Sequence, residues 1–182
     1  MYGAAFYNLD RSWPGELGDN MELAASILRK FGEPRTLNKH RGQYPFHLTF
    51  DYYCCYTEEE AVKIGKFLKS YSWTPHEVWF DKMECAIHGY GDLVSFVLMV
   101  DEKSQQELTR WVLKNEQDLE ATTGVQKHIP RTQLQDFHMT LATVNQSSFP
   151  VQSAVEEINR VLPRGKWHKS PVFLQQPVFQ GL

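Results

Sequence analysis

The sequence predicts an α+β fold of two pseudo-symmetric lobes, with two antiparallel sheets facing a central cleft and helices on the outside. Helical and strand periods follow one another without the Gly-rich turns and regular order of a parallel nucleotide-binding sheet. The order helix, basic connection, His-x-Thr strand, capped helix and strand occurs near the start and again from residue 103. The two His-x-Thr strings, at His47 and His138, lie about half of the 182-residue chain apart, so we expect residues 1–182 to form one duplicated domain.

Changes of period mark the individual elements. Apolar alternation bounded by turn residues predicts strands at residues 4–9, 46–53, 78–88, 93–100, 136–144 and 172–179, the last interrupted by Pro177. Apolar residues at helical spacing predict helices at residues 19–31, 58–71, 103–121 and 153–162. Two polar, basic connections, residues 35–45 and 126–132, lead into the two His-x-Thr strands.

Capping signals support all four of these helices; in the last one Pro150, and Ser153 with Glu156 three residues on, mark the start. Asn20 is placed to cap the first helix and Gly32 to end it. Thr57 and Glu60 form a capping box, in which the Thr hydroxyl accepts from the backbone of Glu60 while the Glu carboxylate reaches back. Gly124 follows the third helix, where a residue in the left-handed conformation commonly ends a helix.

The composition excludes several classes of protein. Hydrophobic residues make up 42% of the chain, aromatic residues 13% and charged residues 23%, which argues against wholesale disorder. The apolar run at residues 96–100 suits a buried strand and is far too short for a membrane span. The first residues show no basic stretch followed by an apolar core, so we expect no secretory signal and no membrane partner.

Cysteine usage indicates the cellular compartment, and the net charge indicates the kind of ligand. Cys54, Cys55 and Cys85 are odd in number and none stands in a Cys-x-x-Cys spacing, which argues against a disulfide framework and a zinc site. We therefore expect a reducing compartment, cytoplasmic or nuclear. A net charge of −3 argues against the broad positive surface that holds long nucleic acid, whereas a small anionic ligand or a nucleic-acid end needs only a few local donors. The sequence leaves the oligomeric state open and favours a monomer.

The two His-x-Thr strings carry the chemistry. They are Phe-His-Leu-Thr-Phe at residues 46–50 and Phe-His-Met-Thr-Leu at residues 137–141. Because successive side chains of a strand point to opposite faces, each string turns its His and Thr one way and its apolar residues the other. A sheet that buries the apolar face then presents a proton shuttle and a hydroxyl to a cleft. The alternative for each His is an ordinary, hydrogen-bonded histidine on a strand.

The paired strings, half a chain apart in a duplicated α+β layout, resemble the signature of the 2H phosphoesterase superfamily: two His-x-Thr/Ser motifs, each followed by an apolar residue. The resemblance covers most of the chain as an order of elements, and its specific part is the two strings. It implies a bilobed fold with one motif on each side of the cleft, and metal-independent action on 2′,3′-cyclic phosphates, 2′,5′ linkages or RNA 3′ ends. It also implies that His47 and His138 carry the acid/base catalysis and that Thr49 and Thr140 bind the phosphate.

The residue types suit that reaction. Attack on a phosphodiester needs a base that takes a proton from water or a hydroxyl, and an acid that protonates the leaving alkoxide, and two histidines can divide these tasks. Threonine hydroxyls and an imidazolium can donate hydrogen bonds to the non-bridging oxygens in the transition state. The sequence leaves open which His is the base and which is the acid.

Further residues are candidates for substrate contacts. Arg41 and Tyr44 precede the first string and Arg131 precedes the second, so they could bind a phosphate or base at the cleft mouth; the alternative is solvated loop charges. Four aromatic residues could stack on a base, although packing is their commoner role: Tyr52, Tyr53, Trp73 and Tyr90. Residues 166–169, Lys-Trp-His-Lys, resemble a basic surface patch, and a solvated loop explains them equally well.

The sequence therefore favours a phosphoric diester hydrolase that acts on a nucleotide or an RNA end. The main alternative is a non-catalytic module of the same fold that binds a nucleotide or RNA. A second alternative is a structural domain in which both strings are coincidental. The geometry distinguishes them: an enzyme needs the two imidazoles within reach of one phosphate across an open groove, whereas coincidental strings would point into separate cores.

Overall fold

The computed structural model describes residues 2–8, 15–38, 46–54, 56–87, 91–129, 136–174 and 176–180. Within these residues the fold is α+β, with four α-helices and two antiparallel sheets, as the sequence predicts. The helices are α1 (Gly15–Arg29), α2 (Glu58–Ser70), α3 (Glu102–Thr123) and α4 (Val151–Val161). The strands are β1 (Tyr2–Asn8), β2 (Thr36–Leu37), β3 (His47–Cys54), β4 (His76–Val78), β5 (Phe80–Ile87), β6 (Leu93–Val100), β7 (His138–Asn145), β8 (Val172–Leu174) and β9 (Val178–Gln180).

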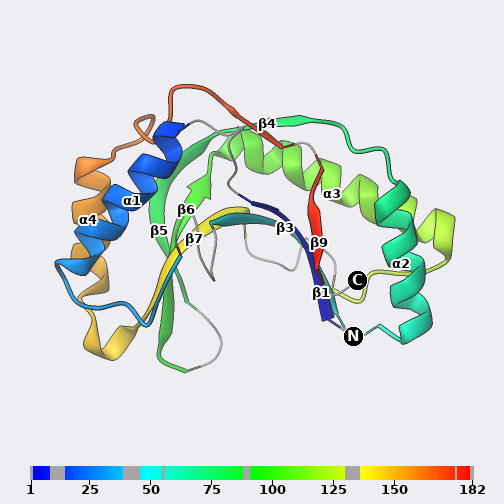
Figure 1. The fold of residues 1–182 in the computed structure, drawn as a ribbon, viewed down its shortest axis with the longest axis horizontal. Coiled ribbons are helices and arrows are strands. Elements are labelled where there is room, and N and C mark those ends of the chain that lie inside the picture. Colours follow the sequence, from blue (N-terminus) through cyan, green and yellow to red (C-terminus); the bar gives the residue numbers. More distant parts are fainter. Residues whose placement is uncertain are drawn as a thin grey trace.

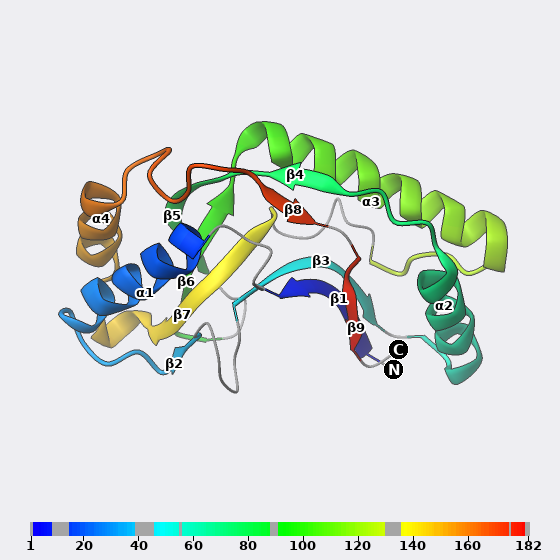
Figure 2. The ribbon, with the colours of Figure 1, turned by 45° about the horizontal axis from the view of Figure 1, so that its top comes forward.

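The larger sheet has the strand order β5-β6-β7-β3-β1-β9, and β2 pairs with β7 beside this path. β4 and β8 form a separate, two-stranded sheet near α3 (Figure 2). The larger sheet is curved into an arch, with the helices on its outer side (Figure 1). The two sheets expected on either side of a cleft are thus the two halves of this sheet, β5-β6-β7 and β3-β1-β9, joined where β3 pairs with β7.

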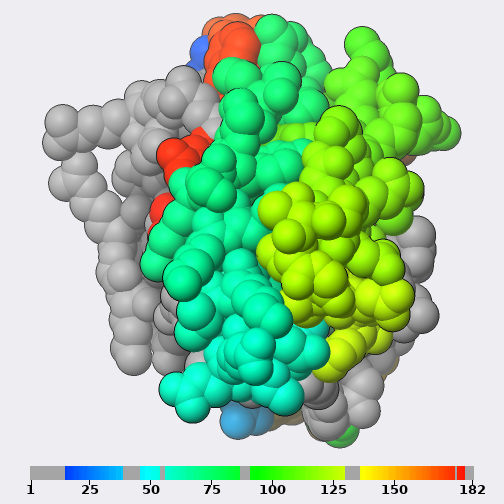
Figure 3. Space-filling view, turned by 90° about the vertical axis from the view of Figure 1, so that its right-hand side faces the viewer, coloured from blue at the N-terminus to red at the C-terminus, as the bar shows by residue number. Residues whose placement is uncertain are grey.

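Each half of the sheet is covered by two helices that come from different parts of the chain. α1 and α4 pack together over the half that contains β5 and β7, and α2 packs against α3 on the other side. Figure 3 shows α2 and α3 side by side on the outer surface. The repeated order of elements is present, but one repeat does not make one lobe. α1 precedes the first His-x-Thr strand in sequence and covers the half of the sheet that holds the second.

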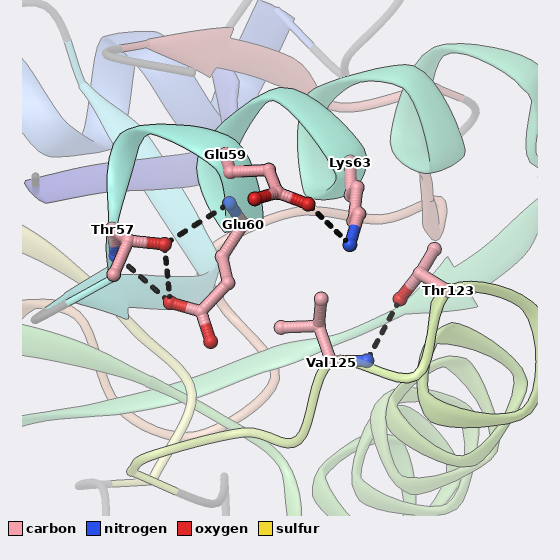
Figure 4. A network of polar contacts seen from close by, with 6 residues as sticks. All are labelled: Thr57, Glu59, Glu60, Lys63, Thr123 and Val125. Carbon is pink, nitrogen blue, oxygen red and sulfur yellow. Dashed lines mark hydrogen bonds and ion pairs between the residues drawn. The ribbon is translucent and has the colours of Figure 1, made fainter.

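Capping side chains fix the ends of α2 and α3. The Thr57 hydroxyl accepts from the Glu60 backbone N–H at 3.3 Å, and the Glu60 carboxylate accepts from the Thr57 N–H at 2.8 Å, which confirms the capping box (Figure 4). At the start of α3 the Asp101 carboxylate accepts from the Ser104 N–H at 2.8 Å. Gly124 ends α3 with a φ of 71°, a left-handed conformation that favours glycine.

The apolar helix faces pack against the sheet and form one core. Its helical members include Ala24, Ile27, Leu28, Ala61, Ile64, Phe67, Leu68, Leu108, Trp111, Val112, Leu119, Ala154 and Ile158. α1 begins at Gly15, before the predicted start, and so adds Leu17 and Met21 to its buried face. Leu23 and Val161, expected to face inward, are exposed instead. The helices thus have the predicted period, but the set of residues on their buried faces differs from the prediction at the edges.

Asn20 lies inside α1 and does not cap it. Its amide Nδ2 donates to the carbonyl oxygens of Lys166 at 3.0 Å and Trp167 at 2.9 Å, and so holds the segment before β8 against the helix. Trp167 and His168 are 0% and 3% exposed. The two interpretations of residues 166–169, a basic surface patch and a solvated loop, are therefore wrong for the two central side chains, which belong to the core, whereas Lys166 and Lys169 are exposed.

Two predicted strands are each divided in the structure. The run at residues 78–88 breaks at Trp79, which separates β4 in the small sheet from β5 in the large one. The Trp79 backbone bonds to the start of α3: its N–H donates to the Ser104 hydroxyl at 3.0 Å and its carbonyl accepts from the Asp101 N–H at 2.7 Å. The run at residues 172–179 is divided into β8 and β9, on either side of Pro177.

Candidate functional site

The two His-x-Thr strings lie on neighbouring strands at the centre of the larger sheet. The first string begins β3 and the second begins β7, and these antiparallel strands pair with Leu48 opposite Met139. Because antiparallel pairing runs in opposite directions from this point, the His of each string lies across from the Thr of the other. The resulting pairs are His47 with Thr140, and His138 with Thr49.

All four polar side chains share one face of the sheet. Leu48 and Met139 are 0% exposed, and the residues on either side of them in each strand point to the opposite face. The His and Thr of both strings are partly exposed. This face is the inner side of the arch, away from the helices (Figure 1). Diagonal neighbours on antiparallel strands lie about 7–8 Å apart, so this register gives both imidazoles access to one phosphate.

The two strings have the same burial pattern over their whole length. From residue 46 to 53 and from residue 137 to 144 the order is buried, partly exposed, buried, partly exposed, buried, buried, partly exposed, buried. The third partly exposed position, Tyr52 in the first string and Thr143 in the second, returns to the face that carries the His and Thr. The match supports an internal duplication centred on the two strings.

A β-bulge after each Thr explains the two consecutive buried positions. In the pairing of β3 with β1 the register passes from Thr49 directly to Asp51, which leaves Phe50 as the extra residue. In the pairing of β7 with β6 it passes from Thr140 to Ala142, which leaves Leu141 as the extra residue. A bulge bends its strand and changes the direction of nearby side chains. The apolar residue after each Thr is thus the bulged residue, and its side chain is buried in the core.

Past the pair of Leu48 with Met139, each of the two strands bonds to residues of the basic connection that precedes the other string. β2 pairs with the part of β7 that follows the bulge, and Asn38 bonds to the bulge itself. On the other side, the Lys127 ammonium donates to the Tyr52 carbonyl and forms an ion pair with Asp51 at 2.8 Å. The two basic connections are therefore anchored crosswise: a residue before β3 holds β7, and a residue before β7 holds β3.

The hydrogen bond of the His138 ring fixes its tautomer. Nδ1 lies 2.6 Å from the Asp136 backbone carbonyl oxygen. A carbonyl can only accept, so Nδ1 carries the proton, and Nε2 is the nitrogen that gains or loses one. A histidine held in this way can act as a base when neutral and as an acid when charged.

A pocket of about 390 Å³ adjoins His138 on the β5-β6 side. Its lining combines two carboxylates with apolar side chains: Glu84, Cys85, Ala86, Val97, Met99, Asp136 and His138. Glu84 is also paired with Lys82. Burial raises the pKa of the Cys85 thiol to about 11, so this thiol is protonated at neutral pH and is a poor nucleophile.

The structure brings together His47, Thr49, His138 and Thr140, and it tests the aromatic candidates in part. Arg41, Tyr44 and Arg131 lie outside the described residues, as does Tyr90. Tyr53 belongs to the core, so base stacking by Tyr53 is wrong. Trp73 is partly buried and packs edge-on against Phe50 and Trp111, and Tyr52 is partly exposed on the same face as the four polar side chains.

Neither a metal cluster nor a membrane helix is found in the part of the chain that the structure describes. Among these residues, no group of three or more His, Cys, Asp and Glu side chains is placed to hold a metal ion. No helix among them is long and apolar enough to cross a bilayer.

Comparison with known proteins identifies a shared fold. No family model matches the sequence, and no curated protein sequence matches it. A structure of Kluyveromyces marxianus Usb1 with uridine monophosphate aligns over 97% of this chain and 98% of that chain, with a TM-score of 0.54 and 12% identity. The chain shares the fold of Usb1. A second structure of Usb1 from the same organism aligns over the same shares of both chains, with a TM-score of 0.52 and 11% identity. At this identity the likeness to Usb1 concerns the fold alone.

Proposed function

We propose that this protein is a metal-independent phosphodiesterase that acts on a nucleotide 2′,3′-cyclic phosphate, a 2′,5′ linkage or an RNA 3′ end. His47 and His138 serve as its acid and base. The observation that carries the proposal is the register of Leu48 opposite Met139, because two imidazoles and two hydroxyls then share one partly exposed face of the sheet. Coincidental strings would have no reason to meet in register with the same burial pattern and the same bulge.

The proposed reaction uses each group for one task. One imidazole takes the proton from the attacking water or hydroxyl, and the other protonates the departing alkoxide. Thr49 and Thr140 donate hydrogen bonds to the non-bridging oxygens, where negative charge accumulates in the transition state. Each Thr lies across from the His of the other string, so a phosphate bound between the strands meets one hydroxyl and one imidazole from each side.

A nucleotide is the proposed ligand for two reasons. A protein of the same fold, Usb1, has been solved with uridine monophosphate. The pocket beside His138 has the size of a small-molecule site, and its apolar residues Val97 and Met99 suit the flat face of a base. The carboxylates of Glu84 and Asp136 disfavour a phosphate in that pocket and can accept from sugar or base donors. We therefore assign the nucleoside to the pocket and the phosphate to the His and Thr side chains.

The remaining sequence candidates become proposals about affinity. Arg41, Tyr44 and Arg131 are proposed to bind the phosphate or base of the substrate. If they do, Arg41→Ala, Tyr44→Phe and Arg131→Ala should raise KM more than they lower kcat, because contacts made equally in the ground and transition states affect binding only.

The test is a panel of 2′,3′-cyclic nucleotides, 2′,5′-linked oligonucleotides and short RNAs, assayed with a chelator present. We expect turnover of at least one substrate, with a loss on the order of 10²–10⁴-fold in both His47→Ala and His138→Ala. His128→Ala is a matched control, since His128 is exposed and lies against Tyr56 instead of in the site. Turnover that survives both substitutions would contradict the assigned roles, and turnover abolished by the chelator would contradict the metal-independent mechanism.

A non-catalytic binding module is the second candidate, and the same panel distinguishes it. Such a module would bind a nucleotide or RNA end without turnover, and His47→Ala and His138→Ala would weaken binding only. The presence of both His and both Thr side chains on one face favours the enzyme, because binding alone does not require two proton-transfer groups.

A further inference from the structure

Two side-chain amides bond to the backbone of the second His-x-Thr string, one on each side of it. We propose that Gln105 and Asn38 are positioning residues that hold His138 and Thr140 in the geometry for catalysis, an inference that rests on the proposed function. Gln105 comes from α3 and Asn38 from the segment after β2. Neither residue belongs to the string itself.

Gln105 bonds to both polar groups of the residue that precedes His138. Its Oε1 accepts from the Phe137 backbone N–H at 2.7 Å, and its Nε2 donates to the Phe137 carbonyl at 2.6 Å. Nε2 also lies 3.3 Å from the Val100 carbonyl. The amide thus adds to the pairing of β6 with β7, in which the Val100 N–H donates to the same Phe137 carbonyl at 3.1 Å, and it fixes both peptide planes next to the Cα of Phe137. His138 is the next residue along the chain, so its backbone orientation follows.

Asn38 bonds to the bulge on the other side of the string. Its Nδ2 donates to the Thr140 carbonyl at 2.9 Å, and its backbone N–H donates to the Leu141 carbonyl at 2.8 Å. Asn38 is 8% exposed, so water does not readily replace these donors. Carbonyl groups at a bulge lose their ladder partners, and a buried carbonyl without a donor is costly. Asn38 supplies one donor to Thr140, whose hydroxyl is the proposed phosphate contact, and one to Leu141, the bulged residue.

The strand arrangement gives these contacts their role. β7 pairs with β6 along the whole string, whereas its register with β3 is one pair of residues, Leu48 with Met139. Gln105 and Asn38 add side-chain contacts at the two ends of the string, and so limit the movement of its backbone relative to β3. A misplacement of about 1 Å at a reacting group can cost about 10²-fold in rate, so bracing of this kind bears on turnover.

Carboxylate substitutions test each amide with little change of shape. Gln105→Glu keeps the acceptor for the Phe137 N–H but turns a carboxylate oxygen toward the carbonyls of Phe137 and Val100. Asn38→Asp does the same at the Thr140 carbonyl. Each variant exchanges a hydrogen bond for repulsion between oxygens. Gln106→Glu and Asn145→Asp are matched controls, because both residues are exposed and have no side-chain contact with the string.

The experiment combines steady-state kinetics with NMR of the uniformly ¹⁵N-labelled protein. We expect kcat to fall about 10–100-fold in Gln105→Glu and Asn38→Asp with KM changed far less, as for loss of alignment in the transition state. The imidazole signals of His138 and the amide signals of Thr140 and Leu141 should shift in these two variants. The control variants should match the wild type in both measurements.

The outcomes separate this inference from the proposed function. Wild-type kcat in folded Gln105→Glu and Asn38→Asp would overturn the positioning roles while the enzyme remains active. A lower kcat with unchanged His138 and Thr140 signals would overturn them too, because the effect would then arise elsewhere. If the wild type has no turnover, the proposed function fails, and the NMR signals alone decide the positioning. Should a carboxylate variant not fold, Gln105→Met or Asn38→Ser, which adds no charge, takes its place with the same expectations.

Discussion

One hydrogen bond determines how His138 can act. Its Nδ1 donates to the Asp136 carbonyl at 2.6 Å, which leaves Nε2 to exchange the proton. Nδ1 remains a donor whether the ring is neutral or charged, so the contact persists through the proton transfer. In the proposed reaction the ring therefore needs no change of tautomer or orientation before it acts, which keeps the reorganisation cost of the step low.

The threonine hydroxyls give the first prediction. Thr49→Val and Thr140→Val remove a donor and keep the branched shape, so we expect kcat to fall about 10²-fold or more, as when one oxyanion donor is lost. Thr49→Ser and Thr140→Ser keep the hydroxyl and should retain most of the activity. The measurement is kcat on the best substrate of the panel. The control is Thr143→Val, whose hydroxyl bonds to Ser95 at 3.1 Å. Val variants as active as the wild type would contradict the role.

The buried His168 gives a prediction about stability and pH. Burial lowers its pKa below the usual value, while Glu16 and Asp101 oppose this shift. The neutral ring accepts from the Phe80 N–H through Nε2 at 2.9 Å and donates to the Ser170 carbonyl through Nδ1. Below about pH 6.5 the unfolded chain takes up a proton at this histidine before the folded protein does, so folding loses stability as the pH falls from that value.

Urea unfolding at pH 7.5 and pH 5.5 measures this loss. We expect the free energy of unfolding to drop less in His168→Gln than in the wild type between these two pH values. Carboxylates and the other histidines titrate in both proteins, so the comparison isolates His168. Equal drops in the two proteins would show that His168 does not contribute to the pH dependence.

Residues with a periodic pattern could be predicted, and residues that act through single long-range contacts could not. His47 and Thr49 were predictable because a strand period of two puts them on one face, and the second string repeats them. Asn38 and Gln105 left no pattern, because their partners are 102 and 32 residues away in sequence. A polar side chain that bonds to distant backbone looks like any loop or helix amide. His168 was misjudged for a similar reason, since its lysine neighbours suggested solvent.

At the scale of the elements, the bulges explain why an apolar residue follows each Thr. Phe50 and Leu141 are the extra residues of their strands and are buried in the core. A polar residue there would have to enter the core without a partner, which is costly. The bulge also separates the His and Thr positions, at the start of each strand, from the regular ladder beyond them. The same bulge occurs in both strands, and in each strand the side chain of the bulged residue packs into the core.

The buried ion pair of Lys127 and Asp51 gives a prediction about stability. Their side chains are 4% and 0% exposed, and Lys127 also lies 4.1 Å above the centroid of the Tyr53 ring. Lys127→Met leaves the Asp51 carboxylate buried without its ammonium partner, so we expect a loss of about 3–5 kcal/mol in the free energy of unfolding. The double variant Asp51→Leu with Lys127→Met should lose less than the sum of the single variants. Urea unfolding followed by circular dichroism measures all three.

The control for this prediction is an exposed ion pair of the same chemistry. Lys63 bonds to Glu59 at 2.9 Å on the surface of α2 (Figure 4). Lys63→Met should change the free energy of unfolding by about 0.5 kcal/mol or less, because exposed pairs are screened by water. If Lys127→Met were as mild as Lys63→Met, the crosswise anchor on β3 would have no role in stability.

The starts of α2 and α3 were predicted more closely than those of α1 and α4. The structure places the starts of α2 and α3 within a residue of the prediction, and the capping box of α2 is present. α4 begins at Val151, two residues before the prediction, and Pro150 at its N-cap has no side-chain cap hydrogen bond, so the predicted start signal at Ser153 is wrong. α1 begins at Gly15, where two glycines and acidic residues hide the buried positions of Leu17 and Met21. The break at Trp79 depends on bonds to the start of α3, which no local pattern indicates.

At the scale of the whole molecule, the two motifs are brought together by one strand contact in an interlocked fold. The half of the sheet with the second string is covered by α1 from the first part of the chain and by α4 from the last. The α+β class could be predicted, because the order of helical and strand periods is visible in the sequence. The exchange of helices between lobes and the joining of the halves at β3 and β7 could not, because strand pairing over such separations depends on packing.

The most direct test of the central claim is a crystal structure with a nucleoside 2′- or 3′-monophosphate bound. The claim is that His47 and His138 form one phosphodiester site. It predicts a phosphate within about 2.6–3.2 Å of an imidazole nitrogen of each histidine, with the Thr49 and Thr140 hydroxyls on its oxygens. A nucleotide whose phosphate contacts only one of the two histidines, or lies away from both, would contradict the claim.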